Sequence, residues 1–155
     1  MNVIFLDYDG VVNTPIWSFR AGKWICTYAT PSDNKVNNEQ AVQWLSEFCE
    51  KYGYSIVVSS TWRFDDNYKD CLRNAGLRNS IQIIGRTPYI SCGHRGDEIG
   101  KWLSEHPEVK KYLIFDDETD MLQHKSHLVK CDTTRGFGLK ELQEAESLQQ
   151  KLYPQ

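Results

Sequence analysis

Short apolar runs rich in β-forming residues alternate along the chain with segments of helical periodicity. Five such runs are expected to be strands, at residues 2–6, 54–59, 81–84, 112–115 and 127–131. Each is nearly continuous, which is typical of strands buried on both faces of a sheet. Apolar residues at helical spacing predict helices at about 39–52, 65–75, 96–105 and 138–152, and a short one at Met121 and Leu122. The alternation predicts an α/β fold of three layers, with helices on both faces of a central five-stranded parallel sheet.

The segment 13–37 does not fit this alternation. Its centre, residues 16–29, contains two aromatic-rich arms around Ala21 and Gly22, which predicts a β-hairpin after the first strand. The other elements use almost all of the 155 residues, so one domain over 1–155 is expected. The insertion is too short to be a domain of its own, since a separate domain needs about 50 residues.

The composition excludes several classes of protein. The formal net charge of −3 argues against a general polyanion binder, because non-specific DNA affinity comes from a basic surface. No apolar run approaches the roughly 18 residues of a membrane helix, and the first residues do not form a secretory signal, so a cytoplasmic protein without a membrane partner is expected. Five cysteines without a CxxC pair indicate neither a disulfide framework nor a zinc site.

Carboxylates follow two of the expected strands directly. Asp7 and Asp9 come after the first strand, and Asp116, Asp117 and Asp120 come after the fourth. If both strands are central, these five carboxylates converge at one edge of the sheet, where like charges destabilise the fold unless a cation is present. Because all the ligands would be hard oxygens, the pattern favours Mg²⁺. Asp is also common in turns and caps, but that explanation does not account well for two acidic strand ends.

Hydroxyl and basic side chains mark two further strand ends or helix starts. Ser59, Ser60 and Thr61 end the second strand, where a hydroxyl can hydrogen-bond a phosphate oxygen or simply cap a helix. Arg95 precedes the third helix, where it is either a ligand for an anion or a solvated surface charge.

These motifs, in this order, resemble the four motifs of the haloacid dehalogenase-like (HAD) phosphatase superfamily. The stretches FLDYDGVVN, VVSSTWR, RGDEIGKWL and LIFDDETDM are similar to small HAD domains that occur alone or attached to RNA-repair proteins. The resemblance covers nearly the whole chain and implies a Rossmann-like, HAD-type fold. It also implies that the 16–29 hairpin is the flap of the family, and that no cap domain covers the site.

The resemblance implies a Mg²⁺-dependent phosphatase that works through an aspartyl phosphate. Asp7 matches the nucleophile, and Asp9 matches the acid/base that protonates the leaving oxygen and then activates water. Asp116 matches the acidic metal ligand, supported by Asp117 or Asp120. With Asp7 and Asp9, these residues form the expected metal site. An acid at the Asp9 position favours phosphatase or phosphomutase chemistry over dehalogenase or ATPase chemistry.

For two of the family's functional positions, the sequence offers two candidate residues each. Ser60 is the expected phosphate-binding hydroxyl, and Ser59 is the alternative because a one-residue register error would exchange them. Arg95 matches the position where the family usually has Lys, and Lys101 is the fallback for that cationic role.

The loops at the strand ends indicate the class of substrate. Arg20, Arg63 and Arg86 leave strand carboxyl ends and, with Ser59 and Thr61, are candidate substrate-binding residues. The same loops contain aromatic residues: Trp17, Trp24, Trp62, Phe64, Tyr89 and Phe137. Arginine side chains can bind phosphates, and aromatic side chains can stack on bases. Their combination in these loops suits a phosphorylated nucleic-acid end or a nucleotide as the substrate. The alternative is that the aromatics anchor loops and Arg63 pairs with Asp65 or Asp66.

Two other classes of function compete with the phosphatase. A Mg²⁺ nuclease could use an acidic cluster, but it would need neither the Ser/Thr strand end nor a nucleophilic Asp. A non-catalytic phosphate-binding or adaptor domain would keep the binding residues without turnover. A response-regulator receiver is excluded, because its phospho-acceptor Asp ends the third strand, where this chain has Gly85 and Arg86.

Overall fold

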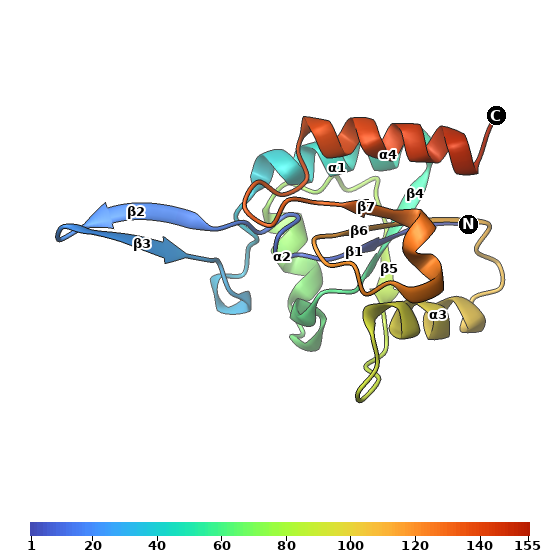
Figure 1. The fold of residues 1–155 in the computed structure, drawn as a ribbon, viewed down its shortest axis with the longest axis horizontal. Helices are drawn as coiled ribbons and strands as arrows, with labels where there is room; N and C mark the ends of the chain where they lie inside the picture. The colour runs from blue at the N-terminus through green and yellow to red at the C-terminus, as the bar shows by residue number, and fades with distance from the viewer.

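A parallel five-stranded sheet forms the centre of the protein, as predicted. The computed structural model describes residues 1–155. The strand order is β5-β4-β1-β6-β7, which places β1 in the middle (Figure 1). The strands are β1 (Asn2–Leu6), β4 (Tyr54–Val58), β5 (Ile83–Arg86), β6 (Lys111–Asp116) and β7 (Leu128–Lys130).

Four α-helices and three 3₁₀ helices connect the strands. The α-helices are α1 (Glu39–Tyr52), α2 (Tyr68–Asn74), α3 (Arg95–Glu105) and α4 (Leu139–Leu152). The 3₁₀ helices are η1 (Pro31–Asp33), η2 (Thr61–Phe64) and η3 (Leu122–His127). Helices α1 and α4 cover one face of the sheet and α3 covers the other (Figure 1). No helix combines the length and the apolar character that a membrane crossing requires.

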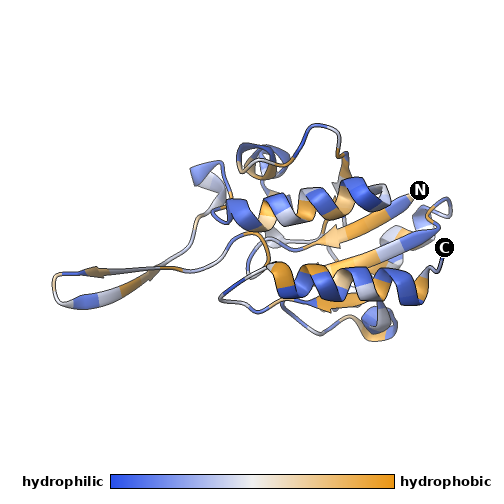
Figure 2. Ribbon diagram, turned by 90° about the horizontal axis from the view of Figure 1, so that it is seen from above, coloured by the Kyte–Doolittle hydropathy of each residue, from blue (hydrophilic) through white to orange (hydrophobic).

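The core is divided by the sheet into two clusters. Leu6, Val58 and Phe115 belong to the larger cluster, to which α1, α2 and α4 contribute. Phe5 and Ile114 belong to the smaller cluster, which contains Ile99 and Trp102 of α3 among its members. The central strands are mostly hydrophobic in Figure 2, whereas the helices alternate between hydrophobic and hydrophilic residues. Both faces of the sheet are therefore covered, as the continuous apolar runs predicted.

The register of the three central strands lines up the polar residues that follow them. Leu6 pairs with Val58 of β4 and with Phe115 of β6. One residue further along, Asp7, Ser59 and Asp116 therefore form a row at the carboxyl edge of the sheet. Because side chains alternate between the faces of a strand, this row points away from the larger cluster and toward the face that α3 covers.

The segment after β1 forms the expected hairpin. Strands β2 (Ile16–Arg20) and β3 (Lys23–Thr27) pair only with each other, in an antiparallel two-stranded sheet. Ala21 and Gly22 both have positive φ, as a two-residue turn of type I′ requires. The hairpin projects from the carboxyl edge of the central sheet, away from the body of the protein (Figure 1).

Three predicted elements are displaced in the structure. The third strand of the sheet spans Ile83–Arg86 instead of 81–84, because the pairing of β4 with β5 shifts register between Ile56 and Val57. The helix predicted at 65–75 begins only at Tyr68 and is preceded by η2. The short helix expected at Met121 and Leu122 is a 3₁₀ helix that begins at Leu122.

Candidate active site

Three carboxylates meet at the carboxyl edge of the sheet. Asp7, Asp116 and Asp117 each offer one oxygen, and these oxygens lie within 4.8 Å of one another. Asp7 and Asp116 are buried, and Asp117 is half-buried. Gly10 has a positive φ, and a Cβ on it would lie 2.2 Å from Asp117 Oδ2, so only glycine fits beside this cluster.

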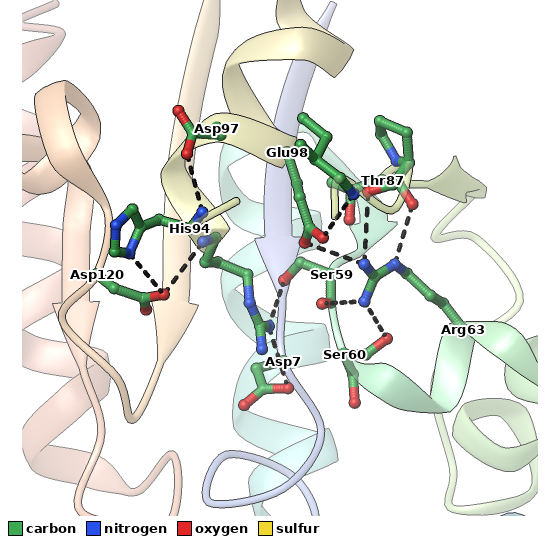
Figure 3. Close-up of polar contacts among 12 residues, drawn as sticks. Asp7, Ser59, Ser60, Arg63, Thr87, His94, Asp97, Glu98 and Asp120 are labelled. Carbon is green, nitrogen blue, oxygen red and sulfur yellow. Dashed lines mark hydrogen bonds and ion pairs between the residues drawn. The ribbon is translucent and has the colours of Figure 1, made fainter. Parts of the chain in front are cut away.

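One arginine and one serine face the same cluster. Arg95, the first residue of α3, places Nη1 3.4 Å from Asp7 Oδ1 and 3.1 Å from Asp116 Oδ2. The same nitrogen donates to Ser59 Oγ over 3.4 Å. Figure 3 shows Asp7 and Ser59 on neighbouring strands with their side chains directed toward each other. The arrangement gathers a carboxylate nucleophile candidate, a cation and a hydroxyl in one place.

The start of α3 is fixed to the segment after β6. Arg95 N donates to Asp120 Oδ2 over 3.1 Å, and Gly96 N donates to the Asp120 carbonyl over 3.0 Å. A Cβ on Gly96 would lie only 2.3 Å from the Met121 carbonyl oxygen, so the two segments are in close contact. Asp120 thus positions the helix that carries Arg95, and the third carboxylate of the cluster is Asp117.

Asp9 is oriented by two donors at the other side of the edge. Its Oδ1 accepts from Asn13 Nδ2 over 2.8 Å and from Trp62 Nε1 over 3.1 Å. The exposed Asp9 carboxylate lines a cavity of about 440 Å³ together with Asp117 and Trp62. Asp9 is not among the carboxylates whose oxygens lie within 4.8 Å of one another, and it borders the cavity, where a general acid could reach a leaving group.

Ser60 and Thr61 belong to the turn after β4. Ser60 Oγ accepts from Trp62 N over 3.3 Å and so caps η2, whereas the hydroxyl that faces Arg95 is that of Ser59. Thr61 is exposed and lines the cavity that contains Asp9. Of the two serines left open by the sequence, the contacts favour Ser59 as the phosphate-facing one.

Burial and mutual repulsion change the acidity of the two buried carboxyls. Burial raises the pKa of Asp7 to about 6, against the lowering effect of Arg95. Burial, together with the neighbouring Asp7, raises the pKa of Asp116 to about 8. Burial alone would lower the pKa of Arg95, but Asp116 and Asp7 raise it above its usual value. The cluster therefore holds more negative charge than Arg95 neutralises.

The cluster fits a hard divalent cation. Asp116 Oδ2 is buried without a hydrogen-bond partner, and its cationic neighbour at 3.1 Å, Arg95, is shared with Asp7. Three carboxylates with free oxygen lone pairs are the donor set that Mg²⁺ takes. Asp7, Asp116 and Asp117 would hold the ion, and Asp120 is engaged with α3 instead.

Arg63 is a structural residue, which corrects its expected role in substrate binding. Its side chain is 3% exposed, and Nη2 lies 3.0 Å from Glu98 Oε2. The other N–H groups donate to backbone carbonyls: those of Ser59, Ser60, Thr87 and Pro88. All five donors are used, and the ion-pair partner is Glu98 rather than the expected Asp65 or Asp66 (Figure 3).

The structure also separates Arg20, Arg86 and Lys101 from the carboxylate cluster. Arg20 pairs with Lys23 beside the turn at the projecting end of the hairpin. Arg86 donates to the carbonyl of Arg63 over 2.6 Å and lies over the Tyr68 ring. Lys101 forms an exposed ion pair with Glu105 on α3, so Arg95 alone of these candidates faces the cluster.

The aromatic residues of the loops divide into buried and exposed ones. Trp62 and Phe137 are buried: Trp62 packs against Tyr8, and Phe137 stacks on Phe115 with ring centroids 4.6 Å apart. These two rings therefore anchor their loops, which is one of the two alternatives that the sequence left open, and they are not accessible for stacking with bases. The others are exposed: Trp17, Trp24, Phe64 and Tyr89.

Sequence reasoning did not identify three residues that hold charged side chains at this edge of the sheet. Asn13 donates to Asp9, Thr133 Oγ1 donates to Asp117 Oδ2 over 2.9 Å, and Glu98 pairs with Arg63. The spacing of Asp9 and Asn13 was the available signal for one of them. Thr133 and Glu98 are remote in sequence from the residues that they contact, so no local pattern marks them.

Comparison with known proteins gives one positive result. The model of the family described as "HAD domain in Swiss Army Knife RNA repair proteins" matches residues 3–142. Neither a curated protein nor a solved structure matches the chain significantly. The matched residues include the carboxylate cluster, both serines and the helix that begins at Arg95.

Proposed function

Because the chain belongs to the family of HAD domains in Swiss Army Knife RNA repair proteins, we propose that it is a phosphatase with Asp7 as nucleophile. The observation that carries this proposal is the position of Asp7 in one row with Ser59 and Asp116, beside Arg95. Phosphoryl transfer depends mainly on positioning and on neutralisation of charge, and these residues supply both.

The reaction proceeds in two displacements. An Asp7 carboxylate oxygen attacks phosphorus, the bond between phosphorus and the leaving oxygen breaks, and Asp9 gives that oxygen a proton. Asp9 then takes a proton from a water molecule, which attacks the aspartyl phosphate and releases inorganic phosphate and free Asp7. Asn13 and Trp62 hold the Asp9 carboxylate in position for both transfers.

Arg95 and Ser59 bind the phosphoryl oxygens in this proposal. A guanidinium that already lies within 3.4 Å of Asp7 also reduces the repulsion between an anionic nucleophile and an anionic substrate. Mg²⁺ bound by Asp7, Asp116 and Asp117 would add charge neutralisation at the same oxygens.

We propose phosphorylated nucleic-acid ends as the substrates. The description of the family names RNA repair, and the hydroxyl side chains of Tyr28, Thr61 and Thr133 line the cavity beside Asp9. Figure 1 shows the hairpin projecting away from the body of the protein instead of folding over the carboxyl edge of the sheet, so a long molecule can present its end at that edge. A nucleotide would use the same contacts at the phosphate.

Hydrolysis of p-nitrophenyl phosphate with and without Mg²⁺ tests the reaction class. The Asp7→Asn variant should lose turnover, and the matched Asp70→Asn variant, which changes an exposed carboxylate on α2, should keep it. A rapid acid quench with ³²P-labelled substrate should trap label on the wild-type protein and none on Asp7→Asn. Turnover that survives Asp7→Asn would overturn the nucleophile, and full activity in excess EDTA would overturn the metal.

A panel of substrates tests the substrate class. Oligonucleotides with 3′- or 5′-phosphates are compared with mononucleotides, sugar phosphates and phosphopeptides at equal concentration. We expect the highest kcat/KM for one of the oligonucleotides. Turnover confined to small metabolites would refute the nucleic-acid substrate while leaving the phosphatase in place. Binding of these compounds without any turnover would indicate the phosphate-binding adaptor instead.

A further inference from the structure

The β2–β3 hairpin exposes large aromatic side chains that no part of the core covers. The exposed fractions are 59% for Trp17, 61% for Phe19 and 69% for Trp24. An isolated two-stranded hairpin is marginally stable in water. Its exposed aromatic side chains are not buried against the core of the domain, so they do not contribute to the stability of that core. Exposed apolar surface of this kind on a projecting element indicates a binding surface.

The three aromatic side chains share one face of the hairpin. Phe19 pairs directly with Trp24, and Trp17 pairs with Cys26 two positions further along. Directly opposed residues point to the same side of an antiparallel pair, and so do residues two apart on one strand. The Phe19 and Trp24 rings lie 5.3 Å apart between centroids. The opposite face contains Ile16 and Ile25, together with Arg20 and Lys23 beside the turn, and no aromatic side chain.

The charge of the hairpin is opposite to that of the whole chain. Arg20 and Lys23 flank the turn, and no acidic residue occurs between Asp9 and Asp33, although the chain as a whole has a net charge of −3. These two cations lie on the face opposite the exposed aromatic rings, but each is next in sequence to one of them, and their long side chains can reach around the narrow hairpin. Exposed rings and cations on one projecting element favour a partner that is anionic and has flat apolar groups. A second copy of the chain would instead bring equal positive charge to this surface.

The hairpin is continuous with the cavity of the candidate active site. Tyr28, which follows β3 and is 45% exposed, lines that cavity together with Asp9 and Asp117. A five-residue strand spans about 17 Å, which matches several stacked nucleotides. A single-stranded nucleic acid whose end lies in the cavity could therefore continue along the hairpin from Tyr28 toward Trp24.

We propose that the hairpin is a stacking platform for single-stranded nucleic acid. Bases stack on Trp17, Phe19 and Trp24, and Arg20 and Lys23 contact the phosphates. The placement of the phosphorylated end at Asp7 rests on the proposed function. The stacking itself does not require turnover, because it depends on residues outside the carboxylate cluster.

Binding of a fluorescein-labelled, unphosphorylated single-stranded RNA tests the platform independently of catalysis. The double variant Trp17→Ala/Trp24→Ala should bind at least about tenfold more weakly, since each base–aromatic contact contributes substantially to affinity. The matched variant Ile16→Ala/Ile25→Ala, on the opposite face, should bind within about twofold of wild type. Trp17→Phe/Trp24→Phe retains flat rings and should restore most of the affinity. Circular dichroism spectra and thermal unfolding midpoints like those of wild type show that each variant is folded.

The dependence of affinity on salt tests the two cations. For single strands the slope of log affinity against log salt changes by about 0.7 for each phosphate contact. Arg20→Gln/Lys23→Gln should therefore reduce the slope by about 1.4, whereas Lys101→Gln/Lys140→Gln, which removes two exposed helix lysines, should reduce it by much less.

The outcomes separate this inference from the proposed function. If p-nitrophenyl phosphate is hydrolysed but the tryptophan variant binds RNA like wild type, the platform is refuted and the phosphatase stands. If RNA binding depends on the tryptophans but no phosphate ester is hydrolysed, the platform stands and the phosphatase is refuted. Sedimentation that shows a wild-type dimer which the tryptophan substitutions dissociate, with RNA binding unchanged, would assign this face to a second copy.

Discussion

The carboxyl edge of the sheet and the β2–β3 hairpin are adjacent in sequence and differ in how their side chains are held. At the edge, Asp7, Ser59 and Asp116 are at most 5% exposed and sit on paired strands. On the hairpin, Trp17 and Trp24 are more than half exposed and touch no core residue cluster. The first region fixes distances between reacting groups, and the second supplies reach and contact area.

The edge itself contains two arginines with different tasks. Arg63 uses all of its donors on carbonyls and Glu98, so it holds the turn after β4 to the start of α3. Arg95 contacts two carboxylates and one hydroxyl, all through Nη1. Its Nε and Nη2 donate to no protein group and can bind an anion, whereas the fully paired Arg63 stabilises the region.

Substitution of Arg63, whose donors are all paired, should have the largest effect on stability. Arg63→Met leaves Glu98 buried without its partner, which typically costs about 3–5 kcal/mol of unfolding free energy. Urea unfolding followed by circular dichroism measures this loss. Arg63→Met/Glu98→Leu should recover part of it, but not all, because the Ser59 and Ser60 carbonyls stay without donors. A single variant as stable as wild type would contradict the assignment of Arg63 to structure.

Substitution of Arg95 should affect catalysis more than stability. Arg95→Gln should lower kcat/KM for p-nitrophenyl phosphate by about 10²–10³, the usual effect of removing one oxyanion donor. Lys101→Gln, on the exposed side of the same helix, is the matched control and should leave kcat/KM unchanged. If Lys101→Gln were the damaging change, the cationic role would belong to that lysine.

The closely spaced carboxylates at the edge of the sheet should make the stability of the protein depend on pH and on Mg²⁺. The folded-state pKa of Asp116, about 8, lies above the unfolded value of 3.8, so the folded protein binds more protons between these two values and its stability falls as pH rises from one toward the other. Thermal unfolding in EDTA between about pH 6.5 and 8.5 should show the end of this fall, because the folded protein loses the proton within that window and the slope then levels off. Excess Mg²⁺ should restore about 2–3 kcal/mol at roughly one hundred times its Kd.

Asp116→Asn is the control for the pH prediction. The amide does not titrate, so the slope of stability against pH in EDTA should become flatter and the stabilisation by Mg²⁺ should shrink. An unchanged slope in this variant would place the titrating group elsewhere. His124 does not disturb the comparison, since burial lowers its pKa out of this window.

The smallest effect on stability is expected from the hairpin. Trp17→Ala/Trp24→Ala removes a cross-strand aromatic contact worth about 0.2–1 kcal/mol and no core packing. Global unfolding in urea should therefore shift by less than about 1 kcal/mol, in contrast to Arg63→Met. A large loss of global stability would mean that the hairpin belongs to the cooperative unit of the domain.

The fold was predictable because its signals are local. The apolar runs marked β1 and β6 closely, and the helix expected at 39–52 is α1, which Asn38 caps at its start and Gly53 ends with a positive φ. The third strand was placed two residues early, because the register shift beside β5 depends on pairing with β4 rather than on its own sequence.

The candidate site was predictable only in part, for a similar reason. Strand ends identified the carboxylates and the serines, and register selects Ser59 over Ser60 once the strand order is known. The direction of a long side chain is not a local property. Arg63 meets Glu98 35 positions away, and no pattern around either residue shows that the guanidinium turns inward.

The attachment of α3 to the segment after β6 has a thermodynamic consequence for ligand binding. Hydrogen bonds from Arg95 N and Gly96 N to Asp120 complete the ordering of these segments when the protein folds. The conformational entropy of these protein segments is therefore lost on folding, before a ligand binds, and the phosphate-binding position is preorganised. The remaining entropy cost belongs to the polymer, so the unfavourable entropy of binding should grow with the length of the strand and not with the addition of its terminal phosphate.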